Sequence, residues 1–307
     1  MPAETTTGAD VLAAVPHEPG APKPDPIVVV DGMRKTFGGL VAVDVDHLEI
    51  QRGVITALIG PNGAGKTTFF NLLTGFDSPD TGHAVFDGKE IDGYRPYQLA
   101  GLGMVRTFQL TKSLTKLSVI ENMKLGAKGQ LGERFLPSLV TPLWRRQERE
   151  IEERAMELLR RFQLDHMRDE YAGTLSGGQR KLLEMARALM VEPKLIMLDE
   201  PMAGVNPALT QSLLEHVKRL PTEEGATVVF VEHDMDVVRD ISDWVVVMAE
   251  GQIIAEGPHS SIGQNQAVID AYLGAHHDAP LDADQEEEWL REDRLELGDV
   301  PPRREEP

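Results

Sequence analysis

The chain has 307 residues, enough to bury one full α/β core and leave segments outside it. Its net charge of −19 disfavours a nucleic-acid partner, because an acidic surface repels phosphate backbones. The absence of cysteine excludes disulfides and thiolate metal sites, and no apolar run approaches the roughly 20 residues of a membrane-spanning helix.

Composition divides the chain into three segments. Residues 1–26 are rich in Thr, Ala and Pro and lack the pattern of a secretory signal, so we expect a disordered leader. Residues 275–307 carry twelve acidic residues against four arginines, a net charge of −8, and predict an acidic disordered tail. Within that tail, Trp289 and Leu290 could fold against a partner. Residues 27–274 are expected to form the folded domain.

Hydrophobic patterning in this domain predicts alternating strands and helices. A β-branched run at 27–30, an alternating stretch that ends at Ile50 and a continuous apolar run at 54–59 are typical of strands. From about 95 to 180 the pattern becomes helical and irregular, with a helical stripe at 148–162 and a segment broken by Gly and Pro at 124–143. The α/β pattern then returns, with strands predicted at 195–198, 227–231, 244–248 and 253–256, and helices at 208–220 and 235–241.

The apolar run at 54–59 leads into a glycine-rich segment. Its residues are Gly60, Pro61, Asn62, Gly63, Ala64, Gly65, Lys66, Thr67 and Thr68. A strand before such a segment and a helix after it favour a phosphate-binding loop over a plain glycine turn, because the glycines let successive N–H groups face the anion at the helix N-terminus. Lys66 would then reach the β- and γ-phosphates, and the hydroxyl of Thr67 would be a ligand of Mg²⁺.

Two acidic residues, Asp199 and Glu200, follow the predicted strand at 195–198. A buried strand that ends in carboxylates presents charge where a metal ion and a water molecule can use it. The alternative is a solvated strand end, which the phosphate-binding loop upstream disfavours.

A pentapeptide downstream of the loop is the most informative feature. It consists of Leu175, Ser176, Gly177, Gly178 and Gln179. Alone it could be a turn, but in this order after a phosphate-binding loop it resembles the signature of ATP-binding cassette (ABC) proteins. The resemblance covers about residues 27 to 273 and is strongest to the ATPase subunits of branched-chain amino acid importers (LivG-type). The segments that carry it are 34–43, 75–76, 105–109, 182–190, 201–207 and 232–235.

The resemblance implies an α/β fold: a P-loop NTPase cassette with a RecA-like core, an antiparallel β subdomain and an α-helical signature subdomain at about 95–180. It implies that Glu200 is the general base and that His233 contacts the γ-phosphate. Gln109 would contact Mg²⁺ and water, with Thr67 and Asp199 completing the metal site. Phe37 would stack on adenine.

The resemblance also implies a dimer, because the signature of one subunit closes over ATP on the P-loop of another. Ser176 and Gly178 would donate to that γ-phosphate, and glycines at 177 and 178 would permit the close approach. Asn206 departs from the Asp that most relatives have at the interface, which bears on communication between the two ATP sites.

The function implied is an ATPase that powers an importer, with ATP and Mg²⁺ as its cofactors, at the cytoplasmic face of the cell membrane. Its partners would be transmembrane permease subunits, a second ABC ATPase subunit (identical or related) and, indirectly, a substrate-binding protein, but no nucleic acid. Alternatives within the family are a urea or amide importer and a lipopolysaccharide-type exporter.

Non-transport ABC ATPases are a further alternative, which the sequence disfavours. A chromosome-maintenance protein would need a long coiled coil and a DNA-repair protein would carry zinc-binding cysteines. A translation-associated protein would have two cassettes.

Overall fold

The computed structural model describes residues 8–107, 115–128, 141–205 and 207–275. Gln109, Asn206 and the segment from 276 onward, which includes Trp289, therefore lie outside the described residues.

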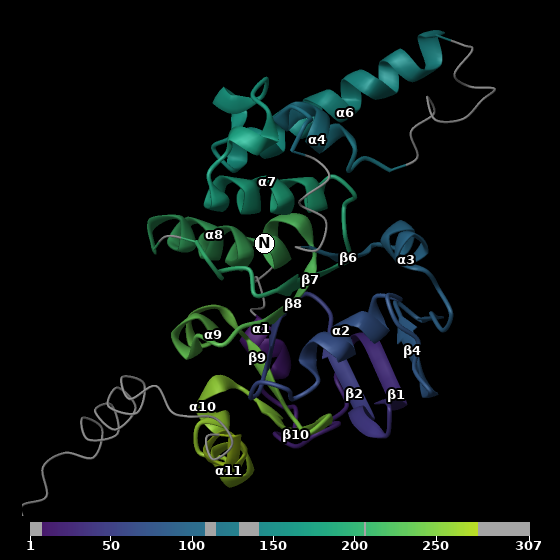
Figure 1. Ribbon diagram of the computed structural model, residues 1–307, viewed down its shortest axis with the longest axis vertical. Helices are drawn as coiled ribbons and strands as arrows, with labels where there is room; N and C mark the ends of the chain where they lie inside the picture. Colours follow the sequence, from purple (N-terminus) through teal and green to yellow (C-terminus); the bar gives the residue numbers. More distant parts are fainter. Residues whose placement is uncertain (1–7, 108–114, 129–140, 206, 276–307) are drawn as a thin grey trace, which may run out of the picture.

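A six-stranded sheet runs from β6, at mid-height in Figure 1, down to β10 in the lower part of the molecule. Its strand order is β10-β9-β3-β8-β7-β6, with β10 antiparallel to β9 and every other neighbouring pair parallel. The strands are β3 (Ile55–Ile59), β6 (Met104–Arg106), β7 (Leu195–Asp199), β8 (Thr227–Val231), β9 (Trp244–Ala249) and β10 (Gln252–Gly257). The predicted strands at 195–198, 227–231, 244–248 and 253–256 are among them.

Both faces of this sheet are buried. Because side chains alternate along each strand, neighbouring residues of one strand pack into apolar clusters on opposite faces. In β3, Ile55, Ala57 and Ile59 pack into one apolar cluster, while Leu58 packs into another on the opposite face. The first cluster is covered mainly by the helices of the upper lobe in Figure 1, the second by the antiparallel sheet and α2. This double burial explains the continuous apolar runs in the sequence.

The smaller sheet is antiparallel, with strand order β2-β1-β4-β5. Its strands are β1 (Pro26–Phe37), β2 (Leu40–Gln51), β4 (Thr81–Phe86) and β5 (Lys89–Glu90). The predicted strand at 27–30 is the start of β1, which continues to the tight turn at Gly38 and Gly39.

The helices flank these sheets. They are α1 (Gly8–Leu12), α2 (Lys66–Leu73), α3 (Pro96–Leu102), α4 (Val119–Lys124), α6 (Thr141–Arg161), α7 (Gly177–Leu189), α8 (Pro207–Arg219), α9 (Met235–Ile241), α10 (His259–Ile262) and α11 (Gln266–Ala275). Short 3-10 turns at Asp165–Met167 and Ala172–Thr174 precede α7, and a π-helix at Leu220–Glu224 follows α8. Within the expected helical subdomain at 95–180, β6 instead pairs with β7 in the central sheet.

The segment before β1 differs from the expected disordered leader over residues 8–25. Leu12, Val15 and Ala21 are at most 6% exposed and belong to the apolar cluster under the antiparallel sheet. The ammonium of Lys23 pairs with the carboxylate of Glu256 at 2.8 Å, and both side chains are buried. Low overall hydrophobicity hid these few anchoring residues, which find their partners far along the chain. We refer to residues 8–25 as the N-terminal strap.

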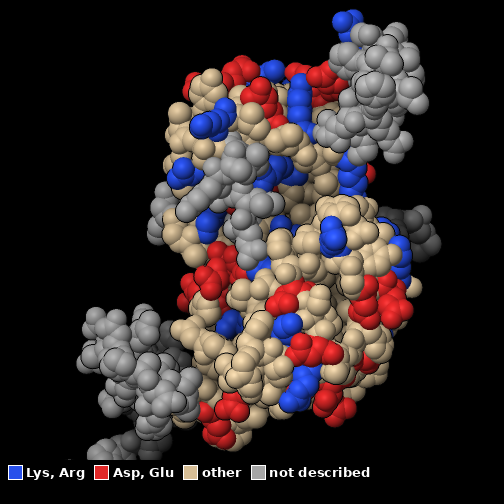
Figure 2. All heavy atoms as spheres, turned by 45° about the vertical axis from the view of Figure 1, so that its right-hand side comes forward, with Lys and Arg blue, Asp and Glu red and all other residues tan. Residues whose placement is uncertain are grey.

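None of the helices that the structure describes combines the length and apolar character needed to cross a membrane. Figure 2 shows acidic side chains in several patches on the lower half of one face, with Lys and Arg interspersed among them.

Candidate functional site

The loop between β3 and α2 has the backbone of an anion-binding loop. Gly60, Gly63 and Gly65 have φ values of 149°, 81° and 100°, which L side chains rarely adopt. A Cβ atom at Gly60 would lie 1.9 Å from the carbonyl oxygen of Met248, and one at Gly65 would lie 2.3 Å from that of Ala42. Gly65 is also the N-cap of α2 and supplies no side-chain cap, so the first turn of the helix can present its N–H groups to an anion.

The side chain of Lys66 is folded into this loop. Its ammonium donates to the carbonyl oxygens of Gly60 at 2.6 Å and Pro61 at 2.9 Å, and the residue is 7% exposed. Burial lowers the pKa of Lys66, while the nearby carboxylates of Glu200 and Asp199 act in the opposite direction. The structure therefore brings the loop lysine and both predicted acids of the β7 tip into one electrostatic neighbourhood.

Asp199 is held by an arginine from the neighbouring strand. The guanidinium of Arg106 on β6 donates through Nη2 to Asp199 Oδ2 and through Nη1 to Asn71 Oδ1, both at 2.6 Å. The Arg106 side chain is 3% exposed and lies 5.6 Å from the ring of Phe70 and 5.9 Å from that of Phe76. A buried guanidinium that makes two hydrogen bonds fixes the orientation of the Asp199 carboxylate.

The residues predicted to hold Mg²⁺ fit that ion where the structure describes them. Thr67 is exposed in the first turn of α2, and the Asp199 side chain is 17% exposed at the tip of β7. A hydroxyl and a carboxylate are the hard oxygen donors that Mg²⁺ prefers, with phosphate oxygens and water completing its shell. Gln109, the third predicted ligand, lies outside the described residues.

Glu200 and His233 form a hydrogen-bonded pair. His233 Nε2 lies 2.8 Å from Glu200 Oε1, and both side chains are nearly half exposed. Glu200 has a φ of 48°, and its N–H donates to the carbonyl oxygen of Val231 at 3.0 Å. A non-glycine residue in the left-handed region is strained, and such residues gather at functional sites. The structure thus brings together two candidates that are 33 positions apart in the sequence.

The signature forms the N-terminus of α7. Ser176 is the N-cap: its Oγ accepts from the N–H of Gln179 at 3.2 Å, and its own N–H donates to Gln179 Oε1 at 2.9 Å. Gly177 is exposed and a Cβ there would meet nothing within 4 Å. Gly178 is buried, and a Cβ there would lie 2.4 Å from Leu209 Cδ1 on α8. Gly177 therefore faces open space and Gly178 lies against α8, while close approach of a ligand to the two glycines stays a prediction.

The predicted signature lies away from the predicted phosphate loop of the same chain. Figure 1 shows α7 in the upper lobe and α2 in the lower part of the molecule. Leu175, the first residue of the signature, is 3% exposed and anchors the turn to the first apolar cluster. Phe37, the candidate adenine-stacking residue, is 49% exposed at the end of β1, with the ammonium of Lys35 5.3 Å from its ring centre.

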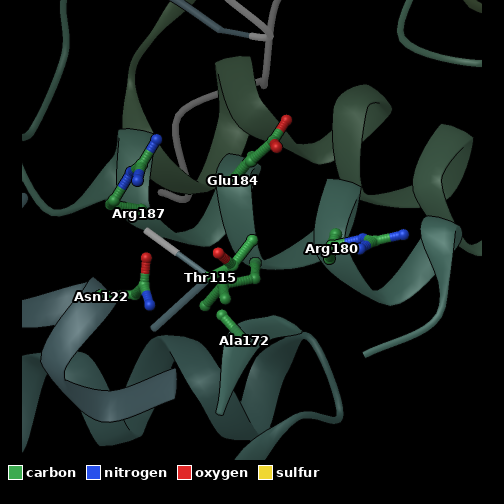
Figure 3. Close-up of a pocket in the computed structure, with 7 residues that line it drawn as sticks. Thr115, Asn122, Ala172, Arg180, Glu184 and Arg187 are labelled. Atoms are coloured by element: carbon green, nitrogen blue, oxygen red, sulfur yellow. The ribbon is translucent and has the colours of Figure 1, made fainter. Parts of the chain in front are cut away.

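A small cavity of about 20 Å³ lies between α7 and the elements that face it (Figure 3). Its lining residues are Thr115, Asn122, Ala172, Arg180, Leu183, Glu184 and Arg187. The volume suffices for about one water molecule. None of the predicted site residues lines this cavity, so it is separate from the phosphate-binding loop.

Comparison with known proteins agrees with this geometry. The sequence matches the ABC transporter family over residues 43–203, more than half of the chain. The chain belongs to the ABC transporter family. The resemblance inferred from the motifs, and the α/β cassette fold that it implied, are therefore confirmed.

Individual relatives of this ABC cassette are similar over most of its length. The probable branched-chain amino acid transport ATP-binding protein LivG of Archaeoglobus fulgidus is 44% identical over 249 residues, which span 81% of this chain and 96% of that protein. The high-affinity branched-chain amino acid transport ATP-binding protein BraF of Pseudomonas aeruginosa is 42% identical over 81% of this chain and 98% of that protein. A crystal structure titled as the ADP conformation of an ATP-binding cassette superposes with a TM-score of 0.69 at 38% identity, covering 81% of this chain and 99% of that one.

Sequence reasoning missed two charged residues of this ABC cassette that support the site. Arg106 lies in the segment 105–109 that carries the resemblance, which assigns it no role, although a charged residue inside a predicted α/β core is itself a signal. Glu232 is 6% exposed, and its carboxylate accepts from the N–H of Met202 at 2.9 Å and from that of His233 at 3.3 Å. Burial raises the pKa of Glu232, against the effect of these hydrogen bonds. Glu232 thereby joins the end of β8 to the loop after Glu200.

Proposed function

We propose that this chain is the ATP-hydrolysing subunit of an importer for branched-chain amino acids and acts at the cytoplasmic face of the membrane. The observation that carries the proposal is the hydrogen-bonded pair of Glu200 and His233 at the tip of β7, close to Lys66 and Asp199 of the phosphate site. A general base, a partner that orients it and a phosphate loop are the parts that ATP hydrolysis needs. Two relatives, at 44% and 42% identity, are named for branched-chain amino acid transport.

The phosphate groups of ATP bind at the N-terminus of α2. The N–H groups of the loop and of the first helical turn donate to the phosphate oxygens, and the helix dipole favours the negative charge. Lys66 exchanges its contacts with the loop carbonyls for contacts with the β- and γ-phosphates. Thr67, Asp199 and Gln109 would hold Mg²⁺, which would neutralise charge on the phosphates. The exposed ring of Phe37 stacks on the adenine.

Hydrolysis starts at Glu200. Its carboxylate takes a proton from a water molecule while the water oxygen bonds to the γ-phosphorus and the bond from that phosphorus to the bridging oxygen breaks, which yields ADP and phosphate. His233, hydrogen-bonded to Glu200 Oε1, holds the carboxylate in place and directs its second oxygen at the water.

Two cassettes complete each site. Because α7 lies apart from α2 in one chain, the signature that closes over a bound ATP comes from a second subunit, either identical or related. Ser176 and the open face of Gly177 present the N-terminus of α7 to the γ-phosphate there. Closure of the pair moves the helical lobe against transmembrane permease subunits, and a substrate-binding protein acts on the far side of these.

The first test is Glu200→Gln in the purified full chain. We expect loss of ATP turnover with retained ATP binding and an ATP-dependent dimer that does not dissociate. Turnover within a few-fold of wild type would show that Glu200 is not the base.

The second test mixes a Lys66→Ala chain with a Ser176→Arg chain. In a mixed homodimer both substitutions fall in the same composite ATP site, which leaves the second composite site with an unaltered Lys66 and an unaltered Ser176. Turnover of the mixture above that of either variant alone supports a signature that acts in trans between identical subunits. No recovery would indicate pairing with a different cassette.

The third test concerns the solute. Deletion of the gene should lower the uptake of radiolabelled leucine, isoleucine and valine, and the wild-type gene but not the Glu200→Gln variant should restore it. Unchanged uptake of all three amino acids would remove the substrate assignment and leave the ATPase assignment intact.

A further inference from the structure

Lys181, on the second turn of the signature helix, reaches the backbone that carries the catalytic carboxylate. Its ammonium donates to the carbonyl oxygen of Pro201 at 3.0 Å and to that of Glu200 at 3.4 Å, and it makes a third, shorter contact with that of Ala203. A lysine ammonium has three hydrogens, so one side chain can hold all three carbonyls.

The segment to which Lys181 donates these hydrogen bonds is a strained turn, which we name the base loop (residues 200–205). It starts at Glu200 with a φ of 48° and passes through Gly204 with a φ of 70°. Inside the loop the N–H of Ala203 donates to the carbonyl oxygen of Glu200 at 3.2 Å, and that of Val205 donates to the carbonyl oxygen of Met202 at 3.1 Å. Strained backbone of this kind persists only where its surroundings hold it.

Two charged side chains hold the base loop from different elements. Glu232, at the end of β8, accepts from the N–H of Met202 at 2.9 Å. Lys181, on α7, donates to carbonyl oxygens of the same loop. The Glu232 carboxylate thus binds an N–H group of the base loop and the Lys181 ammonium binds its carbonyl groups. Glu232 directly follows β8 of the central sheet, which also carries the phosphate loop, whereas Lys181 belongs to the helix that begins with the signature.

The first turn of α7 is held by its cap and by α8. Ser176 caps the helix and Gly178 packs directly on Leu209 of α8, so the first turn has little room to shift by itself. Lys181 follows Ser176 by five positions, about one and a half helical turns. A displacement of the N-terminus of α7 therefore reaches the carbonyl of Glu200 through the side chain of Lys181, beside the contact of Gly178 with α8.

We infer that Lys181 is a positioning residue for Glu200. It places the Glu200 carboxylate correctly when the signature of the same subunit contacts the nucleotide bound to the partner subunit. The inference rests on the proposed function and adds to it a physical link between the two ATP sites of a dimer. The signature of one subunit contacts the ATP held by its partner, while Glu200 of that subunit acts on its own ATP. Through Lys181, engagement at the first site improves the placement of the base at the second site without being required for turnover there.

The test compares Lys181→Met with wild type in the purified full chain. Methionine keeps the apolar length of the side chain and removes the ammonium. We expect kcat to fall about tenfold to a hundredfold, as for a small misplacement of a catalytic group, while KM and the affinity for ATP stay within about twofold. Lys181→Arg, which restores a cationic donor, should recover most of the lost kcat. Lys218→Met is the matched control, because Lys218 lies on α8, is partly exposed and pairs with Asp240.

A double-variant cycle tests whether Lys181 links Ser176 to Glu200 or only supports the structure of the base loop. If Lys181 relays engagement of Ser176, then Lys181→Met should add little to the loss of kcat that Ser176→Ala already causes. In the Glu200→Gln background, Lys181→Met should leave the ATP-dependent dimer intact, because dimer closure does not need the base loop to be placed.

Three results would overturn the inference: a kcat of Lys181→Met within threefold of wild type, fully additive losses in the cycle, or a loss of ATP affinity as large as the loss of kcat. If Lys181→Met does not fold, Lys181→Leu decides, since it also removes the donor and keeps apolar volume; a kcat within threefold of wild type for it would overturn the inference. Absence of ATPase activity in the wild-type chain would instead refute the proposed function.

Discussion

The N-terminal strap makes a strong prediction about stability. Glu256 on β10 is 1% exposed, and its carboxylate accepts from the N–H of Ala21 at 2.9 Å, the ammonium of Lys23 at 2.8 Å and the indole N–H of Trp244 at 2.9 Å. Lys23→Met removes the only cation among these donors and leaves the carboxylate buried. Breaking a buried ion pair on one side costs about 3–5 kcal/mol, so we expect the free energy of unfolding to fall by about that amount.

The assay is denaturant unfolding of the full chain followed by circular dichroism, with hydrogen exchange at the N–H of Ala21 as a local measure. The double variant Lys23→Met with Glu256→Gln should recover most of the loss, because no unpaired charge remains buried. Lys218→Met, which breaks a partly exposed pair, should change the free energy by no more than about 1 kcal/mol. A loss below about 1 kcal/mol for Lys23→Met, or no recovery in the double variant, would refute the reasoning.

Three further predictions concern the phosphate loop, the acid that it faces and a buried histidine. Gly65→Ala places a Cβ atom 2.3 Å from the carbonyl oxygen of Ala42 at a φ of 100°, so we expect ATP binding to be lost in a titration with a fluorescent ATP analogue; wild-type affinity would contradict the loop geometry. Arg106→Met leaves Asp199 without its buried partner and should lower the free energy of unfolding by about 3 kcal/mol, near the lower end for such pairs since Asp199 keeps some exposure; a change under about 1 kcal/mol would argue against a buried pair. Burial and two nearby arginines lower the pKa of His216, so the folded state binds a proton less readily and wild-type stability should fall as pH drops below about 6.5; His216→Phe should remove part of this loss between pH 7.5 and 5.5, and an unchanged pH dependence would contradict the assignment.

Several features followed from the sequence alone because local rules decide them. A glycine-rich segment between an apolar run and a helix can adopt few backbones, and the positive φ values of Gly60, Gly63 and Gly65 are those that such a loop needs. Continuous apolar runs predicted strands buried on both faces, and β3 and β8 are fully buried.

Tertiary structure decided which charged residues meet. The pairs Arg106–Asp199 and Lys23–Glu256 join residues 93 and 233 positions apart, and no local pattern marks either pair. Buried charges are set by where strands and helices pack, because only a partner at hydrogen-bond distance offsets their desolvation. The order of the N-terminal strap also depends on tertiary structure. Its few apolar residues become buried only against the antiparallel sheet, so composition alone predicts disorder for this segment. Hydrophobic patterning predicted the α/β fold and the resemblance of the motifs predicted the cassette, whereas packing alone determined which of the charges are buried, paired and placed to act.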